Sequence, residues 1–170
     1  MVKRVAITGS ESTGKSMLSK QLAEHYQTAW VPEYAREYLD QLGRSYEEED
    51  LLAIALGQLN LEKNVETQTG RYLFSDTELL VVKIWSDVKY KRCDPRILEM
   101  LEAQQYDLYL LCYIDIPWEY DPQREHPHLR EHLFNLYHDE MLERNWNFRI
   151  VSGLGITRLK NAIKFVEECL

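Results

Sequence analysis

The clearest motif in the sequence is Gly9-Ser10-Glu11-Ser12-Thr13-Gly14-Lys15-Ser16. It fills the pattern G-x-x-x-x-G-K-[ST] without a mismatch and closely follows the apolar run Val5-Ala6-Ile7. Glycine at the two fixed positions lets successive backbone N–H groups turn toward phosphate oxygens. We therefore expect residues 9–16 to bind the phosphates of ATP, with Lys15 at the β- and γ-phosphates and Ser16 on Mg²⁺.

Apolar residues recur at helical spacing directly behind this loop. They are Met17, Leu18, Leu22, Ala23 and Tyr26. A helix that begins here directs its positive N-terminal end at the same phosphates. Strand, loop and helix are thus in the order that a phosphate-binding loop requires, which makes a chance match of a glycine-rich turn the weaker explanation.

Composition and charge narrow the class of protein. The chain has 170 residues, of which 45% are hydrophobic and 28% charged, as in one ordinary globular domain. The formal net charge of -8 argues against nucleic acid as a partner, because a phosphate backbone requires a basic surface. No apolar run approaches the ~20 residues of a membrane helix. The three cysteines are widely spaced, which favours reduced thiols in a cytoplasmic protein. The N-terminus runs straight into the first predicted strand, so we expect no signal peptide.

Four further apolar runs predict strands, at residues 28–31, 72–76, 106–114 and 148–151. Helical periodicity predicts helices near 46–65, 94–101, 129–145 and 159–170. The run at 79–85 fits either a strand or a helix, and we choose a helix because it follows a strand that ends in aspartate. This alternation predicts one domain over residues 1–170. Its expected fold is a three-layer α/β P-loop NTPase fold with a five-stranded parallel sheet of order 2-3-1-4-5.

The predicted helix at 46–65 has Ser45 as its candidate cap and an acidic first turn. Its predicted buried stripe consists of Leu52, Ala55, Leu56 and Leu59. Gln58 lies beside that stripe and is either a group that reaches a ligand or, more simply, a surface amide.

Two acidic residues stand at predicted strand ends. Asp76 ends the strand at 72–76, and a carboxylate there can hold Mg²⁺ or its water shell beside the Ser16 hydroxyl. Glu33 follows the strand at 28–31, at the sheet edge where ligands bind in α/β folds. We expect Glu33 to be the acceptor-side carboxylate and Arg36 a positive partner of substrate or phosphate. The alternative is that Glu33 and Glu37 are solvated charges of a surface helix.

The polar segment at about 117–130 has the composition of a lid. Arg124 and Arg130 would bring positive charge over a phosphoryl group in transfer, whereas a solvated loop is the alternative. His126-x-His128 suggests a metal site, but no cysteine or well-spaced carboxylate completes it, so surface histidines are expected. Gly153, after the last predicted strand, either borders the nucleotide base or belongs to a simple turn.

Several stretches together resemble one known family. They are residues 9–16, Glu33-Tyr34-Ala35-Arg36-Glu37-Tyr38, Ile54-Ala55-Leu56-Gly57-Gln58, Phe74-Ser75-Asp76-Thr77-Glu78 and Ile116-Pro117-Trp118. Over nearly the whole chain they resemble the ribosylnicotinamide kinase domain of NadR-type proteins, a group of P-loop kinases. The resemblance implies ATP- and Mg²⁺-dependent phosphorylation of the 5′-hydroxyl of nicotinamide riboside, which gives nicotinamide mononucleotide.

The same resemblance assigns roles to single residues. It keeps Lys15 and Ser16 in their P-loop roles and Asp76 on the magnesium side. It implies that Glu33 orients or deprotonates the attacking hydroxyl and that Arg124 belongs to the lid.

Two departures from the family pattern limit what can be transferred. No H-x-G-H-type adenylyltransferase motif occurs, so NAD synthesis itself is not expected of these residues. Thr77-Glu78 stands where a second aspartate is expected. Two alternatives stay open: a kinase for another nucleoside or deoxynucleoside, and a regulatory nucleotide-binding ATPase that acts as a switch.

Overall fold

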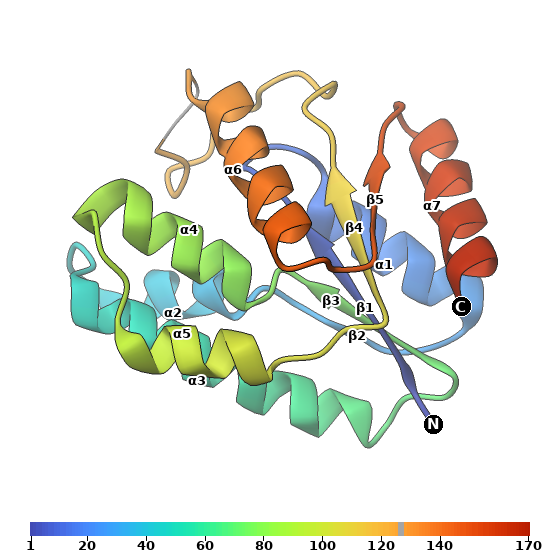
Figure 1. The fold of residues 1–170 in the computed structure, drawn as a ribbon, viewed down its shortest axis with the longest axis horizontal. Helices are drawn as coiled ribbons and strands as arrows, with labels where there is room; N and C mark the ends of the chain where they lie inside the picture. Colours follow the sequence, from blue (N-terminus) through green and yellow to red (C-terminus); the bar gives the residue numbers. More distant parts are fainter. Residues whose placement is uncertain (126–127) are drawn as a thin grey trace.

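The computed structural model describes residues 1–125 and 128–170 and contains one five-stranded sheet (Figure 1). The strands are β1 (Lys3–Thr8), β2 (Trp30–Val31), β3 (Tyr72–Asp76), β4 (Leu108–Cys112) and β5 (Phe148–Val151). Their order is β2-β3-β1-β4-β5 and every neighbouring pair is parallel. The predicted fold class and strand order are therefore confirmed.

Helices cover both faces of the sheet (Figure 1). They are α1 (Lys15–Tyr26), α2 (Tyr34–Leu42), α3 (Glu48–Glu66), α4 (Leu79–Tyr90), α5 (Pro95–Ala103), α6 (Arg130–Glu143) and α7 (Ile156–Cys169). The ambiguous run at 79–85 is indeed helical, as part of α4. Among the described residues, no helix combines the length and the apolar character that crossing a bilayer would need.

Successive side chains of the central strands point to opposite faces of the sheet, so the core is divided into two layers. Val5 and Ile7 of β1 pack with the buried side chains of α1 and α7, while Ala6 packs with those of α3 to α6. β4 repeats the pattern, because Leu110 faces the first layer and Leu111 the second. Both faces are buried, which explains why these strands are nearly continuous apolar runs in the sequence.

The buried face of α3 differs from the predicted one. It consists of Asp50, Leu51, Ile54, Ala55, Gln58 and Glu62, and the predicted stripe member Leu56 is 46% exposed. The prediction counted apolar residues only, whereas the buried face also includes three polar residues. The helix is capped by Glu47, which forms a capping box with Asp50, and not by Ser45.

Gln58 is neither a surface amide nor a group that lines the cavity described below. It is buried, and its Oε1 accepts a hydrogen bond from the backbone N–H of Tyr34 at 2.8 Å. Glu33, the N-cap of α2, makes no capping hydrogen bond with its side chain, so α3 supplies an acceptor for the start of α2. Gln58 thus helps to fix the place where Glu33 leaves the sheet edge.

A glycine lets α2 and α3 approach at this point. A Cβ at Gly57 would lie 1.9 Å from the ring of Tyr34, so no larger residue fits without moving that ring. Gly57 is therefore required for close packing, although it is a poor helix former.

Gly57→Ala tests this packing. In an open helix position the change would raise the free energy of unfolding by about 1 kcal/mol. Here we expect it to lower that free energy by about 1 kcal/mol, because displacing the Tyr34 ring costs more than the helix gains. Urea unfolding measures the difference.

Gly70→Ala is the matched control. Nothing lies within 4 Å of a Cβ built at Gly70, so the free energy of unfolding should change by less than about 0.5 kcal/mol. A Gly57→Ala protein that is more stable than the wild type would contradict this account of the α2–α3 contact.

Candidate active site

The loop between β1 and α1 has the backbone of a phosphate cradle. Gly9 and Gly14 have φ angles of 131° and 76°, which a residue with a Cβ rarely adopts. A Cβ would also lie 3.1 Å from the carbonyl oxygen of Cys112 at Gly9, and 2.9 Å from the Ile116 side chain at Gly14. Gly14 is the N-cap of α1 and gives it no side-chain acceptor, so the first N–H groups of the helix can bind an anion.

Two polar side chains of the loop line the cavity described below. Lys15 Nζ donates to the carbonyl oxygen of Ser10 at 2.8 Å, which holds the ammonium group across the loop. The Ser10 hydroxyl is buried and has no hydrogen-bond partner among the described residues. A buried hydroxyl without a partner is costly, and a phosphate oxygen would satisfy it.

Asp76 lies at the carboxyl end of β3 and is 1% exposed. Burial, followed by the negative charge of Glu33, raises its pKa well above that of an ordinary aspartate, while the Ser16 hydroxyl and Lys15 act in the opposite direction. Among the residues that the structure describes, its Oδ1 has no hydrogen-bond partner. A carboxylate oxygen and a serine hydroxyl suit Mg²⁺, which needs few protein ligands when phosphates supply others.

The unexpected Thr77-Glu78 pair has a structural explanation. Thr77 has a φ of 67°, a strained conformation for a β-branched residue, and its N–H donates to the carbonyl of Ile7 at 2.9 Å. The Glu78 carboxylate accepts from the Thr8 hydroxyl at 2.9 Å and from the N–H of Leu80 at 2.5 Å. Burial raises the pKa of Glu78 to about 7. Glu78 therefore caps α4 and ties it to β1, away from the cavity.

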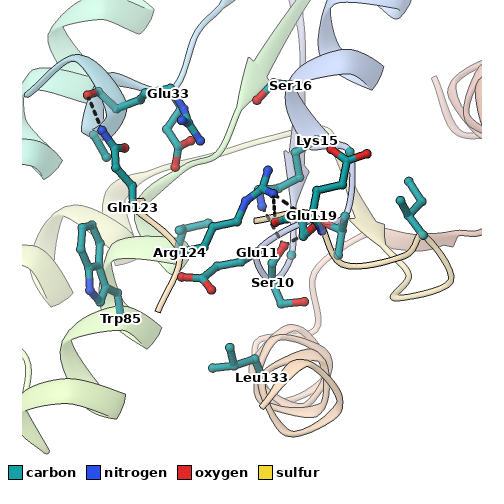
Figure 2. A pocket seen from close by; sticks show the side chains of 18 of the residues that line it. Ser10, Glu11, Lys15, Ser16, Glu33, Trp85, Glu119, Gln123, Arg124 and Leu133 are labelled. Atoms are coloured by element: carbon teal, nitrogen blue, oxygen red, sulfur yellow. Dashed lines mark hydrogen bonds between the residues drawn. The ribbon is translucent and has the colours of Figure 1, made fainter. Parts of the chain in front are cut away.

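A cavity of about 570 Å³ extends from the loop (Figure 2). Lys15, Ser16, Glu33 and Arg124 all line it. Asp76 does not line it, but this buried carboxylate interacts with Glu33, Ser16 and Lys15 behind the cavity wall. Its other wall is apolar and aromatic and is formed by Val81, Ile84, Trp85, Val88, Leu133 and Tyr137. Charged groups at one end and an apolar wall at the other fit a phosphorylated donor beside a flat organic acceptor.

Sequence reasoning did not assign Trp85 to the site. Its Nε1 donates to the Tyr46 hydroxyl at 2.6 Å, and the two rings meet at an interplanar angle of 67° with centroids 4.7 Å apart. The indole is thereby held in one orientation at the cavity wall. The available signal was a tryptophan at the end of the mostly apolar run 79–85.

The arginine-bearing segment lies against the cavity. Arg124 donates to the Ser12 hydroxyl at 3.4 Å and to the Glu119 carbonyl. Arg36 donates to Asp121 of this segment at 2.9 Å, so it has a protein partner besides facing the cavity. Positions 126 and 127 lie outside the described residues, and with them the pairing of His126 with His128. In the described part of the chain, no three acidic, histidine or cysteine side chains cluster as metal ligands.

Gly153 shapes the loop after β5. Its N–H donates to Asp115 at 2.6 Å, and its carbonyl accepts from the buried Arg158 at 2.9 Å. Its neighbours Leu154 and Gly155 line the cavity, whereas Gly153 does not. A role for Gly153 at the nucleotide base stays a prediction.

Comparisons with known proteins agree on one family. The AAA domain family matches residues 4–158. The trifunctional NAD biosynthesis/regulator protein NadR of Escherichia coli (strain K12) is 30% identical over 178 aligned positions, which cover 99% of this chain and 43% of the relative. NadR of Salmonella typhimurium (strain LT2) is 29% identical over 129 positions, which cover 72% and 31%. The chain thus spans less than half the length of these curated relatives.

Solved structures share the fold. A NadR protein in complex with NR has a TM-score of 0.85 and 21% identity, over 99% of this chain and 50% of that one. A NadR protein in complex with NAD and AMP-PNP has a TM-score of 0.80 and 21% identity, over 99% and 49%. Thymidylate kinase from Ehrlichia chaffeensis has a TM-score of 0.69 and 11% identity, over 97% and 98%. At these identities the likeness is one of fold.

Glu33→Gln tests the electrostatics of the site. The change removes a negative charge near Asp76 and leaves the burial of Asp76 in place. We expect the pKa of Asp76 to fall, yet to stay above that of an exposed aspartate because burial is the larger cause. Titration of the Asp76 carboxyl carbon by NMR measures this shift.

The raised pKa of Asp76 also makes the free energy of unfolding depend on pH. A carboxyl group with a raised pKa in the folded protein holds its proton longer there than in the unfolded chain. The free energy of unfolding therefore falls as the pH rises from the ordinary aspartate pKa to the raised one, and it should fall less in Glu33→Gln. Glu37→Gln, at an exposed position of α2, is the control. An unchanged Asp76 midpoint in Glu33→Gln would contradict the coupling.

Proposed function

Because the chain belongs to the AAA domain family and has the P-loop kinase fold of NadR-type domains, we propose that it is an ATP-dependent nicotinamide riboside kinase. The proposed product is nicotinamide mononucleotide, formed by phosphorylation of the ribose 5′-hydroxyl. One observation carries the proposal: the P-loop and Glu33 line one cavity whose other wall is apolar and aromatic, and the buried Asp76 lies close enough to Glu33, Ser16 and Lys15 for them to shift its pKa. Related NadR proteins, one of them with NR bound, support this choice of acceptor.

The donor half of the proposed site consists of residues 9–16 and Asp76. Backbone N–H groups of the loop and Lys15 would bind the β- and γ-phosphates of ATP. Ser16 and Asp76 would hold Mg²⁺, which supplies positive charge to the phosphate oxygens when it is bound. The buried Ser10 hydroxyl and Asp76 Oδ1 have no hydrogen-bond partner among the described residues, and this supports the assignment because such a ligand set would satisfy both.

The acceptor half centres on Glu33. Its carboxylate would accept a hydrogen bond from the 5′-hydroxyl and orient its oxygen toward the γ-phosphorus. As that oxygen bonds to phosphorus and the bond to the ADP oxygen breaks, the hydroxyl proton passes to Glu33. Arg124 would place positive charge beside the phosphoryl group, which matters because the transition state is loose and is stabilised mainly by positioned charge.

The apolar wall suits the base of the acceptor. Trp85 presents an indole that Tyr46 holds in place, and Leu133 and Tyr137 complete an apolar surface. The nicotinamide ring of the riboside carries a positive charge, and a cation over an indole face is favourable.

A panel of acceptors tests the proposed substrate. With Mg-ATP, we expect nicotinamide riboside to give a larger kcat/KM than adenosine, deoxyadenosine or thymidine, measured as acceptor-dependent ADP release. A neutral nucleoside as the best acceptor would replace the substrate assignment and keep the kinase. ADP release without stimulation by any acceptor would contradict the kinase itself and favour an ATPase switch.

Glu33→Gln and Lys15→Ala separate the two halves of the site. We expect Glu33→Gln to lower kcat roughly 100-fold or more, with the Kd for Mg-ATP nearly unchanged, because only the acceptor loses its base. Lys15→Ala should weaken Mg-ATP binding itself, because it removes the cation at the phosphates. Calorimetric binding of Mg-ATP and steady-state rates give the two readouts. A Glu33→Gln protein with wild-type kcat would exclude the acceptor role.

A further inference from the structure

The phosphate-binding loop contains a carboxylate, Glu11, whose place needs a physical explanation. Phosphates repel a negative charge, so a glutamate here should weaken ATP binding. Its presence therefore calls for a role other than binding phosphate. Both carboxylate oxygens face the backbone N–H of Glu125, at 3.1 and 3.2 Å. Glu11 thus contacts the backbone of the segment that carries Arg124, one residue away from it.

The next loop residue, Ser12, binds the same segment. Its hydroxyl accepts from the N–H of Glu119 at 2.9 Å and from Arg124 at 3.4 Å. Ser12 is buried and has a φ of 56°, a conformation that turns its backbone away from the regular path. Residues 119–125 are therefore held to the loop at both ends, by Ser12 at the first residue and by Glu11 at the last.

Glu125 also reaches the acceptor wall. Its carboxylate accepts from the Tyr46 hydroxyl at 2.9 Å and lies 3.5 Å from Lys89 Nζ. Tyr46 in turn accepts from Trp85. A chain of hydrogen bonds thus runs from Glu11 through Glu125 and Tyr46 to Trp85, and it joins the donor loop to the wall that faces the acceptor.

We propose that Glu11 is a positioning residue that fixes Arg124 at the phosphate end of the cavity by holding the Glu125 N–H. This inference rests on the proposed phosphotransfer. Glu11 and Arg124 both line the cavity (Figure 2). A charge-assisted hydrogen bond to a backbone N–H is about twice as strong as a neutral one, so a carboxylate suits this task better than an amide.

Amide exchange in the protein without substrates tests the contact. In Glu11→Ala we expect the Glu125 N–H to exchange roughly tenfold faster, as follows from loss of a charge-assisted hydrogen bond. The Glu119 N–H should keep its protection, because Ser12 still accepts from it. Glu11→Gln should show a smaller rise, since its amide oxygen can still accept. This readout does not depend on which acceptor the protein phosphorylates, so its failure differs from a failure of the proposed function.

Steady-state rates and Mg-ATP binding test the effect of Glu11 on phosphotransfer. In Glu11→Ala we expect kcat to fall roughly tenfold, while the Kd for Mg-ATP is unchanged or lower because a repelling charge is gone. Glu11→Gln should recover part of kcat. Glu24→Ala, at an exposed position of α1, is the control and should match the wild type.

Two results would overturn the proposal. Unchanged exchange at Glu125 in Glu11→Ala would show that the contact does not hold the segment. Weaker Mg-ATP binding together with the loss in kcat would show that Glu11 supports the fold of the loop instead.

Discussion

The parallel pairing of β1 with β3 is the constraint on which the site depends. Ile7 is the register partner of Asp76, and the Thr77 N–H donates to the Ile7 carbonyl at 2.9 Å. The phosphate-binding loop and the Asp76 carboxylate must therefore leave the sheet side by side. β2 pairs with β3 in the same direction, so Glu33 emerges at that edge as well. The carboxyl ends of parallel strands meet at one edge, and this brings together residues that are far apart in the sequence.

Several features that lower the stability of the fold are concentrated at this edge of the sheet. Ser12 and Thr77 have left-handed backbone conformations without being glycine, and the acids Asp76 and Glu78 are buried with raised pKa values. Each of these features lowers stability, and strain and buried charge of this kind gather at functional sites. The contacts of Thr77 with β1 and of Glu78 with Thr8 hold the strained turn in place.

The sequence was sufficient to predict features that depend on local pattern and topology. The G-x-x-x-x-G-K-[ST] pattern, the strand order and the strand-end position of Asp76 follow from motif spacing and from the rules for parallel sheets. Features that depend on tertiary partners were missed. Gln58 and Glu62 extend the buried face of α3 because Tyr34 donates to Gln58 and because Arg4 and Tyr106 donate to Glu62, and periodicity cannot reveal such partners. Trp85 joins the site only through the packing of α4.

We propose that the loop and the two strand-end acids form one phosphotransfer site. Single-turnover reaction of Mg-ATP with nicotinamide riboside that carries ¹⁸O at its 5′-oxygen tests it most directly. We predict that ³¹P NMR of the mononucleotide shows the isotope shift of a phosphorus bonded to ¹⁸O, because the acceptor oxygen attacks the γ-phosphorus. Inorganic phosphate as the only new phosphorus species, with the labelled riboside unchanged, would contradict the claim.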